Sequence, residues 1–98
     1  MIVSFRDGWL GDFFIEDLRS KKIPSDLVSL LFRKIHMIDD ATTDQDLRVP
    51  LSNHFERLKG SLSGLHSIRV NRQWRLIFEW DARHGEARGI YLDNHSYL

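Results

Sequence analysis

The spacing of the apolar residues changes halfway along this 98-residue chain, from a helical period to a strand period. Between residues 74 and 80, large apolar side chains occupy every second position, which predicts a strand with one face on a hydrophobic core. The core-facing positions are Trp74, Leu76, Phe78 and Trp80. The alternate positions, Arg75, Ile77 and Glu79, are expected to face the other way.

Residues 1–51 carry helical spacing in two segments. A first helix is expected after Asp7, a suitable N-cap, with the apolar side chains Trp9, Leu10, Phe13, Phe14 and Leu18. A second helix is expected from Ser25, with the inward-facing side chains Leu27, Leu30, Leu31, Ile35 and Ile38. Residues 39–51 are expected to form a loop with one helical turn near residues 44–47.

Further short strands are expected at residues 2–5, 55–58, 65–70 and 87–92. With the strand at residues 74–80, they predict an α+β fold in which two N-terminal helices pack on one side of a mostly antiparallel sheet. A chain of this length has room for one core, so a single domain over residues 1–98 is expected.

The hairpin around Asn71 has a predictable register. If the core faces of its two strands coincide, Ile68 lies opposite Leu76, and residues 71–73 form the loop. This register sets Arg69 directly opposite Arg75, on the face away from the helices. Like charges directly across a sheet are unfavourable, so either water screens the pair or an anion binds there.

Composition excludes several classes of protein. Fourteen Lys and Arg balance fourteen Asp and Glu, so net charge gives no reason to expect a nucleic acid or a membrane as partner. The absence of cysteine excludes a disulfide scaffold, a thiolate nucleophile and Cys-ligated zinc, and suits a reducing cytoplasm. Charged residues interrupt the first twenty positions, so no signal peptide is expected, and no apolar run reaches the ~20 residues that span a bilayer. A cytoplasmic domain with no membrane partner is expected.

The balanced total hides a separation of charge. Between residues 57 and 78 there are five basic residues and no acidic one. They are Arg57, Lys59, Arg69, Arg72 and Arg75. One interpretation is a solvated outer face of the sheet, which is the default for charged side chains. The other is a phosphate site, in which Lys59, Arg69 and Arg75 act as a clamp because guanidinium meets phosphate oxygens bidentately.

The five histidines, at positions 36, 54, 66, 84 and 95, show no spacing typical of a metal site, so neither a metal nor another cofactor is expected. His36 is interpreted as a half-buried packing residue, and His66 as a hydrogen-bonded residue at the edge of the core. His95 follows the last predicted strand, where side chains emerge beside whatever the sheet presents. The three tryptophans fit core positions, and no aromatic platform for stacking nucleic-acid bases is expected.

Three stretches in the second half resemble the characteristic region of HigB-type toxins, which are plasmid-maintenance killer proteins of the RelE superfamily in type II toxin–antitoxin systems. These stretches are Leu58–Gly60, Gly64–Asn71 and Trp74–Phe78. Four further segments fall in the family's order and at its spacing: Met1–Phe5, Ile38–Thr43, Leu47 and the terminal Asp93-x-His95. The resemblance covers nearly the whole chain.

The resemblance implies an endoribonuclease that enters the ribosomal A site and cuts mRNA during translation, without a metal ion. It also implies neutralisation by a helix-turn-helix antitoxin of the HigA type. Toxin and antitoxin of this type usually repress their own operon jointly, so DNA is expected as a partner only through the antitoxin complex.

Site residues follow from the resemblance position by position. Arg75 matches the family's phosphate-binding arginine and Lys59 its active-site lysine, while Asp93 and His95 match its C-terminal acidic and histidine positions. The remaining basic residues expected to bind RNA phosphates are Arg57, Arg69 and Arg72. Glu56 stands where family members often have histidine and can replace it as a base. Asn94 stands where they often have tyrosine and cannot transfer a proton, so that role is vacant or passes to Tyr97.

Metal-free RNA cleavage needs a base for the ribose 2′-OH, cations for the phosphoryl oxygens, and an acid for the departing 5′-oxygen. Arg75 and Lys59 supply the cations. Glu56 or His95 is the candidate base and His95 or Lys59 the candidate acid, with Asp93 orienting His95. Two alternatives stand beside this interpretation: a ParE-like poison of DNA gyrase, and an inactive relative that serves only as a binding module or co-repressor.

Overall fold

Four antiparallel strands form one sheet, and their order across the sheet is their order along the chain. The computed structural model describes residues 1–94. The strands are β1 (Glu56–Arg57), β2 (Leu65–Arg69), β3 (Arg75–Asp81) and β4 (Glu86–Asp93). Each of these lies within or close to a segment for which the alternation of side chains predicts a strand.

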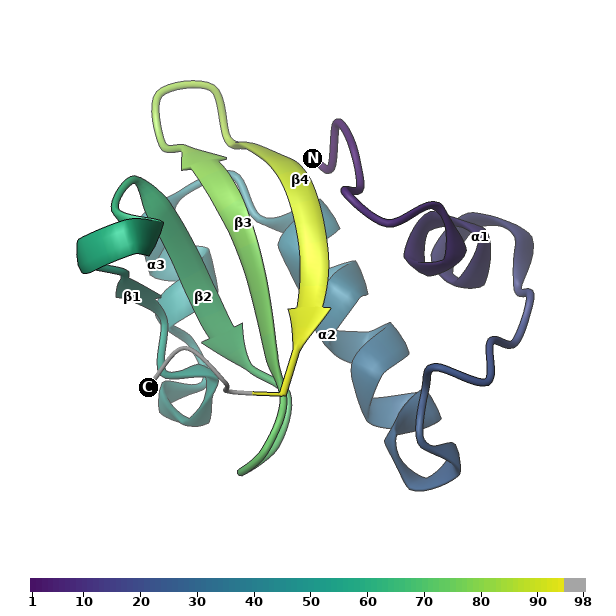
Figure 1. Ribbon diagram of the computed structural model, residues 1–98. Helices are drawn as coiled ribbons and strands as arrows, with labels where there is room; N and C mark the ends of the chain where they lie inside the picture. The colour runs from purple at the N-terminus through teal and green to yellow at the C-terminus, as the bar shows by residue number, and fades with distance from the viewer. Residues whose placement is uncertain (95–98) are drawn as a thin grey trace.

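The helices of the described residues all precede β2 in the sequence. The α-helices are α1 (Gly8–Glu16), α2 (Val28–Asp40) and α3 (Asp44–Arg48). Short 3₁₀ turns are η1 (Ser25–Leu27), η2 (Leu51–Asn53) and η3 (Gly60–Leu62). Figure 1 shows α2 and α3 behind the sheet, and α1 beyond its β4 side. No helix in residues 1–94 is both long and apolar enough to cross a membrane.

The helices and one face of the sheet enclose a hydrophobic core. Its fully buried members include Leu10, Leu31, Ile35 and Ile38 from the helices and Ile68, Leu76, Phe78 and Ile90 from the sheet. The helical period and the strand period each place their apolar residues on one side, and these sides meet. The predicted α+β fold, with helices against an antiparallel sheet, is confirmed.

The helical turn expected near residues 44–47 is α3, and its start is well defined. The side-chain oxygen of Thr43 accepts a hydrogen bond from the backbone N–H of Asp46 at 3.4 Å. The Asp46 carboxylate in turn accepts one from the backbone N–H of Thr43 at 3.2 Å. This reciprocal pair satisfies two backbone donors at the start of the helix and explains why so short a segment is helical.

The predicted hairpin register is also confirmed. Ile68 pairs with Leu76 and Arg69 pairs with Arg75 across β2 and β3. The loop is closed by the side chain of Asn71, whose Oδ1 accepts from the backbone N–H groups of residues 73 and 74, each at 2.8 Å. Such an Asn side chain imitates a backbone turn and pins the two strands together.

Three expectations for the first half are wrong. Leu18 is exposed because α1 ends at Glu16, where the left-handed conformation of Asp17 (φ 57°) turns the chain away. Ser25 does not cap the second helix; it is the first residue of η1, which makes no side-chain cap hydrogen bond. His36 is exposed on α2, where its ring lies 6.1 Å from that of Phe14.

The segment at residues 2–5 does not form a full strand. It makes two isolated parallel bridges with β4, at Ile2 with Ala87 and at Phe5 with Ile90. Between these bridges β4 is irregular at Gly89, whose φ is +63°, and the Gly89 N–H bonds to the Ser4 hydroxyl instead of to a backbone oxygen. The bulge interrupts the ladder and leaves only its two ends paired.

Candidate functional site

The register of the sheet gathers three of the predicted site residues into one row. Arg69 on β2 lies opposite Arg75 on β3, and Arg75 lies opposite Asp93 on β4. All three belong to the face of the sheet turned away from the helices, called here the outer face. Side chains directly opposite each other have Cβ atoms about 5 Å apart, so two guanidinium groups and one carboxylate share a small area.

The arginines of this row are buried, although charged side chains are usually exposed. Arg75 is only 5% exposed and Arg69 is half-buried. An Nη of Arg75 donates to the carbonyl of Asn71 at 3.2 Å, but the buried Nε atoms of both arginines have no hydrogen-bond partner among the described residues. Within residues 1–94 neither guanidinium forms an ion pair. The interpretation of a solvated face is therefore wrong for Arg75, and the row concentrates two positive charges of the kind that bind an oxyanion.

A second row lies beside the first on the outer face. Its members are Glu56, Ser67, Ile77 and Tyr91, paired in that order across β1, β2, β3 and β4. Ile77 is fully buried, and the buried Ser67 hydroxyl has no hydrogen-bond partner in the part of the chain that the structure describes. Glu56 is exposed at the edge of the sheet, one row from Arg69. Its carboxylate can thus reach a ligand held by the two arginines.

Ser67 is a site residue that the sequence pattern alone did not single out. The predicted hairpin register places it opposite Ile77 on the outer face, two positions from Arg69. That register is the signal by which it could have been found. Its hydroxyl is buried beneath the same area.

The other predicted residues are less closely grouped. Lys59 is exposed just after β1, and Arg72 is exposed at the tip of the hairpin that carries Arg75. Arg57 pairs with His66 and so lies on the helix side of the sheet, opposite to the face of Arg75. His95 and Tyr97 lie outside the described residues.

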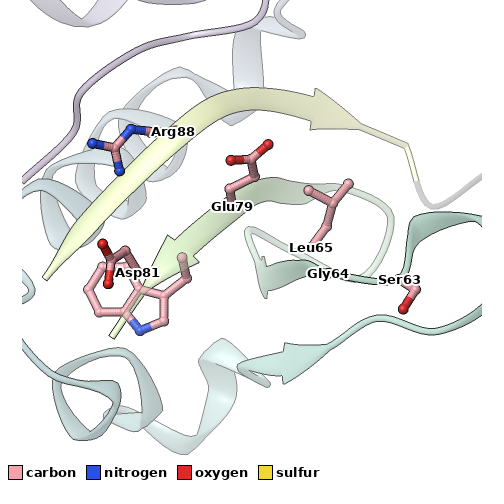
Figure 2. Close-up of a pocket in the computed structure, with 7 residues that line it drawn as sticks. Ser63, Gly64, Leu65, Glu79, Asp81 and Arg88 are labelled. Atoms are coloured by element: carbon pink, nitrogen blue, oxygen red, sulfur yellow. The ribbon is translucent and has the colours of Figure 1, made fainter. Parts of the chain in front are cut away.

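The far end of the outer face has the opposite charge. A cavity of about 420 Å³ lies there, and it contains none of the predicted site residues. Figure 2 shows Glu79, Asp81 and Arg88 around it, together with Ser63, Gly64 and Leu65. An Nη of Arg88 is held by the Glu86 carboxylate at 2.8 Å, so the acidic groups dominate this end. Among residues 1–94, no three His, Asp or Glu side chains lie close enough together to hold a metal ion.

The helix side of β1 carries a separate basic and aromatic cluster. The His66 ring stacks on Phe55 at 5.2 Å between centroids, with 11° between the planes. Burial lowers the pKa of His66, and the charges of Arg57 and Arg48 lower it further, while Asp44 opposes them. The buried Nδ1 of His66 has no hydrogen-bond partner within residues 1–94, so the expectation of a hydrogen-bonded core-edge histidine is wrong at that atom.

Comparison with known proteins adds to this geometry. A family model described as "RelE-like toxin of type II toxin-antitoxin system HigB" matches residues 3–95. The chain is 47% identical over 97 residues to "Toxin HigB-1" of Vibrio cholerae serotype O1, covering 99% of this chain and all of that protein. It is also 42% identical over 93 residues to an uncharacterized protein of Haemophilus influenzae, covering 95% and 90% of the two chains. Both rows of the outer face fall within the matched residues.

Proposed function

Because this chain belongs to the RelE-like HigB toxins of type II toxin–antitoxin systems, we propose that it is a ribosome-dependent endoribonuclease. It cuts mRNA in the ribosomal A site and so stops translation. The observation that carries the proposal is the row of Arg69 and Arg75, two arginines in register whose charges form no ion pair with a described residue. Such a pair attracts a phosphate more strongly than a solvated surface arginine does.

The proposed reaction uses the ribose 2′-OH as nucleophile and needs no metal ion. A base removes the 2′-OH proton, the 2′-oxygen bonds to the adjacent phosphorus, and the bond to the 5′-oxygen of the next nucleotide breaks. The departing 5′-oxygen takes a proton from an acid. The products are a 2′,3′-cyclic phosphate and a 5′-hydroxyl. Arg75 and Arg69 offset the negative charge that grows on the phosphoryl oxygens, which is where fixed donors contribute most.

Glu56 is the base that the described part of the site supports. It shares the outer face with the arginine row and lies at the open edge of the sheet, where a ribose can approach it. Lys59, exposed just beyond β1, is the candidate acid, and its ammonium group supplies positive charge for the phosphate. His95 is the alternative for either role, with Asp93, which lies opposite Arg75, as the residue proposed to orient it.

A type II toxin has an antitoxin partner. We infer that this partner is a helix-turn-helix protein of the HigA type, that the toxin meets DNA only through it, and that both act in the cytoplasm. Ribosome and mRNA are the targets of the free toxin.

Mapping of RNA 5′-ends tests the activity. Purified protein is mixed with a defined transcript, with and without programmed ribosomes. New 5′-hydroxyl ends within the reading frame, only when ribosomes are present, are expected. Arg75→Ala should lower the cleavage rate by about 10²–10³. Arg83→Ala, which changes an exposed arginine in the β3–β4 turn, serves as the matched control and should cut normally.

Other outcomes lead to other functions. Equal cutting of free RNA would indicate a ribonuclease that does not need the ribosome. Growth arrest with DNA damage and without RNA cleavage would indicate a ParE-like gyrase poison. Expression of the wild-type protein without growth arrest or cleavage would indicate a binding module or co-repressor.

A further inference from the structure

A small recess lies beside β1, on the opposite side of the sheet from the arginine row. Its volume is about 180 Å³, and it is lined by Arg48, Leu51, His54 and Phe55. Leu51 is 88% exposed at the start of η2, so its apolar side chain stands at the open edge of the recess. His54 follows η2 in a left-handed conformation (φ 48°), which turns the chain sharply before β1. None of these four residues has a part in the reaction proposed above.

Phe55 gives the recess a rigid aromatic wall. Its ring is stacked on the half-buried His66 and packs against the hydrophobic core. The guanidinium carbon of Arg48 lies 5.4 Å from the centroid of the Phe55 ring, on an exposed side chain that can swing outward. This distance lies within the ~6 Å range of a cation–π contact, so Arg48 covers this side of the ring until its side chain swings outward.

The rim of the recess is positively charged. Arg48 ends α3 and Arg57 lies on the helix side of β1, and both lie close enough to lower the pKa of the His66 imidazole. The nearby carboxylate is that of Asp44, and its Oδ1 already accepts a hydrogen bond from the indole N–H of Trp80 at 2.7 Å. Arg48 is thus the guanidinium that lines the recess, and the Arg57 guanidinium and the Asp44 carboxylate lie in the wider surroundings of His66.

We propose that this recess binds one unpaired RNA nucleotide, with the base stacked on Phe55 against Leu51 and the phosphate held by Arg48. An aromatic wall beside a guanidinium is the combination with which proteins hold single-stranded nucleic acid without reading its sequence. The inference extends the proposed function, on which it rests for the identity of the ligand as RNA. It also revises the expectation that the chain has no stacking platform.

The position of β1 relates the recess to the cleavage site. β1 is an edge strand of two residues, with Glu56 on the outer face and Arg57 on the helix side. Phe55, directly before them, stacks with His66 on the helix side. One RNA strand that crosses this short edge can thus place a nucleotide in the recess and a neighbouring phosphate on the outer face.

Fluorescence anisotropy with a fluorescein-labelled, unstructured ten-nucleotide RNA tests the proposal on the full chain. Phe55→Leu removes the stacking face and should weaken binding about thirtyfold, the middle of the range for loss of one stacked base. Arg48→Gln should weaken binding and flatten the slope of log K against log salt by about 0.7, the value for one phosphate contact on a single strand. Arg19→Gln, which changes an exposed arginine after α1, is the matched control and should bind as the wild type does.

Wild-type RNA affinity and salt slope in both Phe55→Leu and Arg48→Gln would overturn the proposal. If Phe55→Leu fails to fold, as judged by circular dichroism, the salt slope of the exposed Arg48→Gln variant decides alone. Unchanged RNA binding with loss of antitoxin binding would also overturn it, and would assign the recess to the protein partner. The cleavage assay separates the two proposals, because loss of cutting in Arg75→Ala tests the reaction and does not depend on the recess.

Discussion

Arg69 and Arg75 lie directly opposite each other on neighbouring strands, and neither guanidinium forms an ion pair within residues 1–94. The pair lies at the end of the sheet where the β2–β3 hairpin turns. Two like charges directly across the sheet lower the stability of the fold, and the Arg75 side chain is only 5% exposed. Such local conflict between stability and placement is expected at functional sites.

Replacing Arg69 should therefore stabilise the protein and weaken the proposed binding of phosphate at this row. We expect Arg69→Gln to raise the free energy of unfolding by up to ~1 kcal/mol, the size of an unfavourable cross-strand pair. For a domain of this size that corresponds to a rise in Tm of roughly 4–8 °C per kcal/mol. Thermal unfolding followed by circular dichroism measures it, and Arg83→Gln is the control. A lower Tm in Arg69→Gln would mean that the guanidinium contributes more by packing than it costs by repulsion.

A buried lysine predicts a second effect on stability. Lys34, 6% exposed, donates from Nζ to Oδ1 of Asn53 at 2.5 Å, and Nδ2 of Asn53 donates to the carbonyl of Leu47 at 3.1 Å. Asn53→Ala should cost about 2–4 kcal/mol, because it leaves a buried ammonium without an acceptor. Lys34→Met should cost less, since it removes the charge and keeps the volume. Urea unfolding measures both variants, and equal costs would show that the charge is not the cause.

The same lysine predicts a pH dependence. Burial lowers the pKa of Lys34 below its usual 10.5, and the charge of Arg33 lowers it further. The unfolded chain then holds the Lys34 proton more tightly than the folded chain does. The contribution of Lys34 to the free energy of unfolding therefore rises with pH between its folded pKa and 10.5. Below the folded pKa, Lys34 is charged in both states, and burying its charge lowers the stability by the full amount. The difference in unfolding free energy between the wild type and Lys34→Met, measured from about pH 7 to about pH 11, should move in favour of the wild type as pH rises.

Two glycines of the same backbone conformation should respond differently to alanine. Gly85 (φ +64°) and Gly89 (φ +63°) are both left-handed. A Cβ at position 85 would lie 2.8 Å from the carbonyl oxygen of Thr42, whereas a Cβ at position 89 meets no atom within 4 Å. Gly89→Ala should thus cost about 1–2 kcal/mol for the backbone alone. Gly85→Ala should cost a further 1–3 kcal/mol or so for the clash. Chemical unfolding of the two variants gives this difference directly, and equal values would contradict it.

The turn between β3 and β4 contains a titrating pair. The Asp81 carboxylate lies 2.8 Å from Nδ1 of His84. This hydrogen bond raises the pKa of His84 above 6.5. The same contact lowers the pKa of Asp81 below 3.8. The stabilisation from protonated His84 is fully present below pH 6.5 and is lost as pH rises through the folded pKa of His84. The stabilisation from ionised Asp81 is lost as pH falls through the folded pKa of Asp81. An NMR titration should give a His84 midpoint above 6.5 that falls in Asp81→Asn.

The parts of the fold with a clear period could be predicted from the sequence. The alternation at residues 74–80 specifies which face of β3 meets the core, and matching that face to Ile68 specifies the hairpin register. The opposition of Arg69 and Arg75 follows from the register alone. This part of the candidate site is therefore predictable from the spacing of apolar residues.

Other features depend on contacts that no local pattern contains. Ile77 lies on the outer face and yet is fully buried, so the alternation of β3 does not separate buried from exposed positions. The recess beside β1 brings Arg48 of α3 to Phe55, and Phe55 to His66 of β2, which are three separate segments of the chain. The bulge at Gly89 decides that residues 2–5 form bridges and not a strand, and its cause is a single backbone conformation.

The two bridges between the N-terminal segment and β4 have a consequence for the order of folding. The bridge of Ile2 with Ala87 and the bridge of Phe5 with Ile90 can form only after β4 has been synthesised. Asp93, which completes the arginine row, belongs to the same late strand. Contacts so distant in sequence form slowly and only after synthesis has passed them. The row of Arg69, Arg75 and Asp93 is thus complete only after residues 86–93 have been synthesised and β4 has joined the sheet.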